Sequence, residues 1–419
     1  MSSNVPFPGP SPTDSAASPR WLSIVGIGED GIEGLTATAR GLIAGAEIVF
    51  GGKRHLSLAG PLIRGAARPW LSPFAGAADE VFSHRGRQIC VLASGDPFHY
   101  GVGAVLARRI DPSEMIVVPA PSAFSLAAAR LGWSLPETVL LSLHGRTLDL
   151  VRPHLQPSAH IFALTSDGED PRALARLLTE IGFGRSHLTV LEALGGSRER
   201  IRSCEAAEFP FGTVDALNIV AIKVQAAPDA RVLTRTSGLA DDLFEHDAQI
   251  TKREIRAMTL SSLAPRKGEL LWDIGAGAGS IAIEWMLSDT SMRAIAIERR
   301  EDRAACIRRN AMAFGVPGLQ IVEAEAPEAL IGLPTPDAVF VGGGGSHPDV
   351  LDAATRTLRP RGRLVVNAVT VKTEGVLLAH HAALGGELIR IAISRAAPVG
   401  GETGWRPAMP VTQWVWIKP

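Results

Sequence analysis

Two glycine-rich segments, each directly after a short apolar run, constrain this chain more than any other feature. In residues 89–103 an apolar run leads into Ser-Gly-Asp-Pro, and in residues 269–280 another leads into Asp-Ile-Gly-Ala-Gly-Ala-Gly. Glycines let a backbone turn tightly and approach a ligand without a side chain in the way. A glycine loop at the carboxyl end of a strand is the usual ligand position in open α/β sheets. The sequence therefore predicts two separate small-molecule sites.

The rest of the chain alternates short apolar runs with helical patterns, which favours α/β layers. A length of 419 residues suggests about two to three domains. Residues 225–237 break the alternation with Ala, Pro, Asp, Arg and Thr, and we interpret them as a linker. We expect a disordered tail at 1–20, a first domain at 21–225, a linker at 226–240 and a second domain at 241–419.

Strands are expected wherever a short apolar run is bounded by turn residues. In the first domain these runs are 21–26, 47–50, 88–93, 115–118, 139–143, 161–165, 188–191 and 218–224. In the second domain they are 270–274, 294–297, 320–322, 338–341, 363–367, 388–393 and 412–417. Five of the latter seven are apolar runs typical of central parallel strands, whereas the last alternates more and is a candidate antiparallel insertion.

Composition excludes several classes of function. The net charge is −1 and no Lys/Arg run stands out, which disfavours a nucleic-acid partner. The three cysteines lie far apart without a Cys-x-x-Cys pair, so neither a disulfide framework nor a metal site is indicated. No apolar run approaches the ~18 residues of a membrane helix. We expect a cytoplasmic protein that does not enter a membrane.

The second glycine loop differs from a dinucleotide site. A dinucleotide fingerprint is G-x-G-x-x-G, whereas Gly275–Gly279 form G-x-G-x-G and Ser280 follows. Asp273 precedes the loop, either to hold an ammonium group of a ligand or to cap the backbone. Glu298 ends the next expected strand about 20 residues later, where a carboxylate accepts ribose hydroxyls. The alternative for Glu298 is a solvated residue on a charged turn.

Together with these loops, residues 246–254, 323–330 and 337–345 resemble class I methyltransferases, specifically the decarboxylating precorrin methyltransferase subunit. The resemblance covers about residues 241–419 and implies S-adenosylmethionine as methyl donor. Glu325 departs from the family, in which a shorter Asp is expected. The residues implied to line the donor are Thr251, Asp273, Gly275, Ala276, Gly277, Ala278, Gly279, Glu298 and Ala326.

No catalytic residue of this half is assigned, and His347 and Arg299 are the candidates. Gly342–Gly345 leave room for a broad, flat substrate, or they form a loop without a substrate role. His347 stands at the start of an expected helix, where its side chain caps the helix, acts as a base or has neither role. Arg299, Arg300 and Lys372 stand near expected strand ends, either to pair with substrate carboxylates or as solvated charges.

The first half contains G-x-G-x-x-G at residues 26–31. A dinucleotide-binding fingerprint also requires an acidic residue at the end of the next strand, and none stands there, so the motif does not indicate a dinucleotide site. The Ser-Gly-Asp-Pro loop, the Pro-Ser start of the helix after residue 121 and residues 191–200 resemble the tetrapyrrole methylase family, or class III methyltransferases, over about residues 21–225. Asp96 binds the donor or only forms the turn, and His99 and Tyr100 are expected to pack. The donor contacts that the resemblance implies are Gly28, Ser94, Gly95, Asp96, Gly101, Val102 and Ser122.

Joined, the halves resemble the decarboxylating precorrin-6Y C5,15-methyltransferase family of cobalamin synthesis. The resemblance implies a two-subdomain class III fold followed by a class I, Rossmann-like seven-stranded sheet, with one donor site in each. It implies methylation of a modified tetrapyrrole at C5 by the first domain. It also implies C15 methylation and loss of the C12 acetate carboxyl by the second, giving precorrin-8X. A homo-oligomer is expected. Three alternatives stay open: a fused methyltransferase for another small molecule or RNA, a dehydrogenase, or one domain acting as a non-catalytic scaffold.

Overall fold

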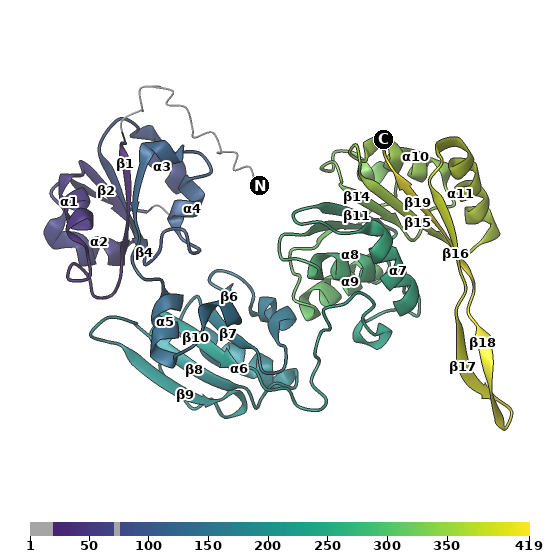
Figure 1. Cartoon of the computed structure of the whole chain (residues 1–419), viewed down its shortest axis with the longest axis horizontal. Helices are drawn as coiled ribbons and strands as arrows, with labels where there is room; N and C mark the ends of the chain where they lie inside the picture. Colours follow the sequence, from purple (N-terminus) through teal and green to yellow (C-terminus); the bar gives the residue numbers. More distant parts are fainter. Residues whose placement is uncertain (1–19, 71–75) are drawn as a thin grey trace, which may run out of the picture. The chain divides into compact units, whose positions relative to one another are not determined.

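The computed structural model describes residues 20–70 and 76–419, which form two compact units (Figure 1). The first unit contains the described residues up to Arg146 together with Ser158–Asp229, and the second contains Thr147–Pro157 and Ala230–Pro419. Two features differ from the expected boundaries: residues 147–157 belong to the second unit, and the division at 229/230 falls inside the expected linker, of which Leu233 and Leu239 are buried in the second unit. The tail expected at residues 1–20 lies outside the described residues, except for Arg20.

The first sheet of the first unit is entirely parallel. It contains β1 (Leu22–Ile27), β2 (Ile48–Gly51), β3 (Ala66–Pro69), β4 (Ile89–Ser94) and β5 (Met115–Val118) in the order β3-β2-β4-β1-β5. Its helices are α1 (Ala37–Gly45), α2 (Lys53–Ala59), α3 (Ala77–Ser83) and α4 (Val102–Leu106). Both faces are covered: Leu22 and Ile24 of β1 share a core with α3 and α4, whereas Val25 and Ile27 share one with α1 and α2.

The second sheet of the first unit is mixed. It contains β6 (Thr138–Ser142), β7 (His160–Leu164), β8 (His187–Glu192), β9 (Arg200–Glu205) and β10 (Asn218–Lys223) in the order β6-β7-β10-β8-β9. Only the β6–β7 pair is parallel. Two α-helices accompany this sheet, α5 (Ala123–Leu131) and α6 (Asp170–Glu180). Phe124 and Ala127 of α5 pack on the sheet against Phe162 and Leu191.

The second unit is built on one seven-stranded sheet. Its strands are β11 (Leu270–Ile274), β12 (Arg293–Ile297), β13 (Gln320–Val322), β14 (Ala338–Val341), β15 (Arg363–Ala368), β16 (Glu387–Ile391) and β19 (Val411–Ile417), in the order β13-β12-β11-β14-β15-β19-β16. The first five strands in this order are parallel, and β19 inserts antiparallel between β15 and β16. These are the seven expected strands, and the expected antiparallel insertion is confirmed.

Helices cover both faces of this sheet. The helices α7 (Arg253–Leu263), α8 (Ser280–Leu287) and α9 (Glu301–Ala313) share one core, and α10 (Pro348–Thr357) and α11 (Val371–Leu384) share the other. The strand order reverses between β11 and β14, and ligands of open α/β sheets bind at such a switch point. The second glycine loop follows β11, so it lies at this position.

Three features were not expected from the sequence: β3, β9 and an exposed hairpin of β17 (Ser394–Val399) and β18 (Glu402–Pro407) (Figure 1). All of them lack a buried apolar face, which is the signal used to predict strands. Among the described residues, no helix is both long and apolar enough to cross a membrane.

Candidate functional site

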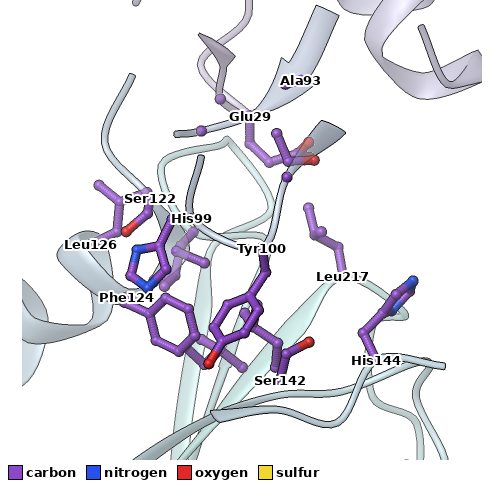
Figure 2. Close-up of a pocket in the computed structure, with 18 of the residues that line it drawn as sticks. Glu29, Ala93, His99, Tyr100, Ser122, Phe124, Leu126, Ser142, His144 and Leu217 are labelled. Atoms are coloured by element: carbon purple, nitrogen blue, oxygen red, sulfur yellow. The ribbon is translucent and has the colours of Figure 1, made fainter. Parts of the chain in front are cut away.

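A cavity of about 570 Å³ lies within the first unit, lined by residues of both of its sheets (Figure 2). Its volume falls in the range of about 300–1,000 Å³ typical of small-molecule sites. Asp96 is not among its lining residues. The predicted residues that line it are Gly28, Ser94, Gly95, Gly101, Val102 and Ser122.

Close backbone contacts bring the loops of the cavity together. The strands β1 and β4 are parallel neighbours, so their carboxyl ends lie side by side. A Cβ atom on Gly26 would lie 1.9 Å from the Gly95 carbonyl oxygen, and one on Gly95 would lie 2.7 Å from the Pro121 carbonyl oxygen. Gly95 also has a φ of 54°. Glycine is therefore required where the loops after β1, β4 and β5 converge.

The neighbouring predicted residues have structural roles. The Asp96 carboxylate accepts the Phe98 N–H at 2.8 Å, which closes a turn. Ser122 is the N-cap of α5, and its hydroxyl accepts the Ser125 N–H at 3.2 Å. Gly101 precedes α4, where a Cβ would lie 2.5 Å from the Pro97 carbonyl oxygen. Donor binding by these residues stays a prediction, and the geometry of Asp96 matches its alternative as a turn former.

Aromatic side chains form another part of the cavity wall. The His99 ring stacks on Phe124 with centroids 4.5 Å apart, and Tyr100 lies beside them in Figure 2. The Tyr100 hydroxyl donates to the Leu140 carbonyl at 3.0 Å, and its φ is 58°. The left-handed backbone of a non-glycine residue is strained and is found preferentially at functional sites.

Glu29, Arg54 and His55 also line the cavity, although no sequence motif singled them out. Arg54 pairs with the Glu29 carboxylate, and its Nη2 lies 2.9 Å from both Ser94 Oγ and His55 Nε2. Burial, followed by the charge of Arg54, lowers the pKa of His55 to about 4. The available signal was the Lys-Arg-His run directly after the two glycines that close β2.

The second glycine loop connects β11 to α8. Gly275 has a φ of 71°, and a Cβ on it would lie 2.5 Å from the Gly343 Cα. Gly277 has a φ of 60°, but its Cβ would meet only the Gln249 carbonyl oxygen, at 3.6 Å. The backbone of Gly343 therefore packs under the start of this loop, which gives Gly275 a packing reason to be glycine.

Asp273 is a buried cap of α8. Its Oδ2 accepts the Ala282 N–H at 3.1 Å, whereas Oδ1 is buried without a partner among the described residues. Burial raises the pKa of Asp273 to about 7, opposed by the Ala282 hydrogen bond and reinforced by the nearby charge of Glu298. The geometry matches the capping alternative, and contact with an ammonium group stays a prediction.

Glu298 is tied to the glycine loop. It is 5% exposed, its Oε2 accepts the Gly277 N–H at 2.9 Å, and its Oε1 accepts the Arg300 N–H at 3.1 Å. The alternative interpretation, a solvated Glu298 on a charged turn, is therefore wrong. Its further lone pairs are available to ribose hydroxyls, which is the predicted role.

The remaining predicted donor residues belong to the loop itself and to two other segments of the second unit. Ala276 donates its N–H to the Ile297 carbonyl, and the Thr251 carbonyl accepts from Arg256 at 2.5 Å. A cavity of about 250 Å³ touches Gly277 and Ala278 on the side of α9. Gly279 is the N-cap of α8, and Ala326 is half-buried, one residue after Glu325.

The two catalytic candidates are exposed and paired with carboxylates. Arg299 Nη1 lies 3.0 Å from the Oε1 of Glu325, the residue at which the family pattern expected Asp. His347 is the N-cap of α10 but makes no capping hydrogen bond, and its Nδ1 lies 3.7 Å from Asp349.

Comparison with known proteins covers both halves. Residues 22–210 match the family model of tetrapyrrole (corrin/porphyrin) methylases, and residues 242–418 match a precorrin methyltransferase domain. A precorrin-6Y C(5,15)-methyltransferase (decarboxylating) of Sinorhizobium sp is 61% identical over 95% of this chain and 96% of that protein. The chain belongs to the precorrin-6Y C5,15-methyltransferase family. The family resemblance and the α/β fold class expected from the sequence are thereby confirmed.

Two further relatives match part of the chain. A cobalt-precorrin-6B C(15)-methyltransferase (decarboxylating) of Salmonella typhimurium is 34% identical over 179 residues, which are 41% of this chain and 92% of that protein. The crystal structure of the C-terminal domain of precorrin-6Y C5,15-methyltransferase from Rhodobacter capsulatus is 44% identical, with a TM-score of 0.43, and covers 44% of this chain and all of that one.

Methyltransferases of this family use S-adenosylmethionine, and the residues present fit such a donor. In the first unit, the cavity is large enough, and Gly28 and Gly95 are among its lining residues. In the second unit, space beside Gly277 is kept free of side chains, and a buried carboxylate on each of the two adjacent strand ends suits a cationic nucleoside without phosphate.

Proposed function

We propose that the chain methylates a precorrin twice and decarboxylates it once. The first unit would methylate C5, and the second would methylate C15 and release CO2 from the C12 acetate. The observation that carries the proposal is the pair of glycine loops, each at the carboxyl end of a central parallel strand of a separate sheet, in a chain 61% identical to a precorrin-6Y C(5,15)-methyltransferase (decarboxylating). The product would be precorrin-8X.

Two donor sites per chain are part of the proposal. In the first unit, Gly28, Ser94, Gly95, Gly101, Val102 and Ser122 would hold the donor on the cavity wall. In the second unit, Gly275–Gly279 would face its amino-acid part, Glu298 its ribose, and the region of Ala326 its adenine. Glu298 supports this role because its carboxylate accepts the Gly277 N–H and is thereby held beside the loop.

The chemistry demands positioning more than acid–base strength. The bound donor supplies an electrophilic methyl group on a sulfonium. Reduced tetrapyrrole carbons are enamine-like nucleophiles, so the residues of each loop need chiefly to hold carbon and methyl in line at ~3–3.5 Å. The backbone loops described above are rigid supports for this task, because hydrogen bonds and close packing fix them at the strand ends.

The carboxyl end of the second sheet offers an apolar surface for decarboxylation. Val369 and Val371 are exposed there, and a Cβ on Gly345 would lie 3.5 Å from Thr373 of the same segment. An apolar surface disfavours a carboxylate relative to the neutral CO2 that leaves it. The ring of the substrate would accept the electron pair. The Salmonella typhimurium relative supports this assignment, because its name joins C15 methylation with decarboxylation in a protein that aligns over only 179 residues.

The expected homo-oligomer also remains a proposal. The hairpin of β17 and β18 exposes Trp405 and Val399, and Met409 follows it. Exposed large apolar residues gathered on one element are typical of association surfaces.

Product analysis tests the proposed function. The purified chain, a precorrin-6Y substrate and a donor carrying a ¹³C-methyl group should give a product with two labelled methyl groups and one CO2 fewer by mass spectrometry. Gly277→Val should abolish the C15 methyl and the CO2 loss while the C5 methyl remains. A single methyl addition by the parent, or unchanged C15 methylation in Gly277→Val, would contradict the proposal.

A further inference from the structure

Three polar atoms meet on the wall of the first-unit cavity. Arg54 Nη2 lies 2.9 Å from His55 Nε2 and 2.9 Å from Ser94 Oγ, and His55 Nε2 lies 2.8 Å from Ser94 Oγ. Arg54 and His55 belong to α2, whereas Ser94 ends β4 directly before the Gly95 loop. All three residues line the cavity. The triangle therefore joins a histidine ring to a hydroxyl at the cavity surface.

The protonation state of His55 follows from its partners. A guanidinium can only donate, so Nε2, which faces Arg54, acts as an acceptor. The neutral ring then carries its proton on Nδ1, which is buried without a partner among the described residues. Burial and the charge of Arg54 hold the pKa at about 4, so the ring stays neutral near pH 7. Arg54 Nη2 also lies within donating distance of Ser94 Oγ, at 2.9 Å, so when Arg54 donates to Ser94 the single lone pair of His55 Nε2 is left to accept the Ser94 hydroxyl.

The positive charge beside the His55 ring is partly offset by a carboxylate. The charged group closest to His55 is Arg54 of the same helix, and Glu29 from the loop after β1 pairs with Arg54. Arg198 also reaches the Glu29 carboxylate, at 3.3 Å. Glu29 offsets part of the charge of Arg54, which lessens the repulsion that a proton arriving on His55 would meet.

We propose that Ser94 and His55 form the proton acceptor for the methyl transfer of the first unit, an inference that rests on the proposed function. Replacement of hydrogen by methyl on a ring carbon must release one proton, so the first unit needs a group that accepts it. Other histidines of the cavity are engaged differently: His99 stacks on Phe124, and His144 bonds the Thr165 carbonyl. Among the described lining residues, His55 is the histidine hydrogen-bonded to a hydroxyl.

The ring carbon gives an electron pair to the methyl carbon, a C–C bond forms, and the methyl–sulfur bond breaks with its pair left on sulfur. The ring then carries one positive charge, and the methylated carbon still bears its hydrogen. That hydrogen leaves as a proton to Ser94 Oγ while the hydroxyl proton of Ser94 passes to His55 Nε2. The C–H pair returns to the ring, which is neutral again, and the imidazolium releases its proton to solvent.

The test compares variants of the full chain in single-turnover reactions with a ¹³C-methyl donor and a precorrin-6Y substrate, reading the C5 methyl by NMR. Ser94→Ala and His55→Gln should each slow C5 methylation at least about 100-fold, the usual contribution of a positioned base. Ser94→Thr keeps the hydroxyl and should stay within about tenfold of the parent. His187→Gln and Ser57→Ala, matched substitutions at exposed positions of the same unit, should not change the rate.

Two measurements separate this role from a structural one. Calorimetry with the demethylated donor should give the same affinity for the first-unit site in the parent and in His55→Gln. NMR titration of labelled histidines in the donor-free chain should give His55 a pKa of about 4. A His55 ring that is still protonated at pH 7, or C5 methylation in Ser94→Ala and His55→Gln within about tenfold of the parent, would overturn the relay. A parent that places no methyl at C5 would instead overturn the proposed function.

Discussion

Gly275 and Gly277 allow a quantitative test of the second donor loop, because they share a left-handed backbone but differ in the space around them. The φ angles are 71° and 60°. An alanine at either position costs about 1–2 kcal/mol in backbone strain. At Gly277 the new Cβ would have its closest contact at 3.6 Å, so strain is the whole effect. At Gly275 it would lie 2.5 Å from the Gly343 Cα, and forced overpacking adds about 1–3 kcal/mol.

The expected loss of unfolding free energy is therefore about 1–2 kcal/mol for Gly277→Ala and about 2–5 kcal/mol for Gly275→Ala. At ~2–4 °C per kcal/mol for a domain of this size, the melting temperature of the second unit should fall by about 2–8 °C and about 4–20 °C. Differential scanning calorimetry of the full chain measures both. Gly332→Ala is the matched control, since its φ is 80° and its Cβ would meet nothing within 4 Å. Equal losses in Gly275→Ala and Gly332→Ala would refute the packing of the two loops.

Three further predictions follow from single residues. Burial raises the Asp273 pKa from 3.8 to about 7, so its contribution to stability is full below the unfolded value and is lost as the pH rises through 7. The unfolding free energy should therefore decline between pH 5 and pH 8, and Asp273→Asn should make that decline smaller by on the order of 3 kcal/mol, measured by urea unfolding. The same decline in the parent and in Asp273→Asn would contradict this. Tyr100→Phe loses one exposed hydrogen bond to Leu140 and should lower the turnover rate less than about tenfold, and a larger loss in steady-state assays would make Tyr100 catalytic. Gly375→Ala, at an exposed interior position of α11 with open space around it, should raise the unfolding free energy by about 0.5–1 kcal/mol, and a destabilised variant would contradict the helix.

The fold was predictable from sequence where a strand is buried on both faces. Strand β11 is a continuous apolar run except for Asp273, and it was expected at its observed bounds. Strand β9, Arg200–Glu205, escaped because it lies at the edge of its sheet with mostly exposed residues. Hydrophobic periodicity reports burial, so an exposed edge carries little of that signal.

Part of the site was predictable for a similar reason. Glycine loops are visible because the backbone itself makes the close contact, as at Gly95 and Gly275. Arg54 and His55 had no comparable sequence signal, because their proposed role depends on hydrogen bonds to Ser94, which lies 39 or 40 residues further along the chain. A single sequence gives no distance between α2 and β4, so this contact needed the structure.

The central claim is that one chain carries two independent methyl-donor sites. Isothermal titration calorimetry of the full chain with S-adenosylhomocysteine tests it most directly. Two equivalents should bind per parent chain, and Gly95→Val and Gly277→Val, once shown to be folded by circular dichroism, should each bind one. A parent chain that binds a single equivalent, or none, would contradict the account.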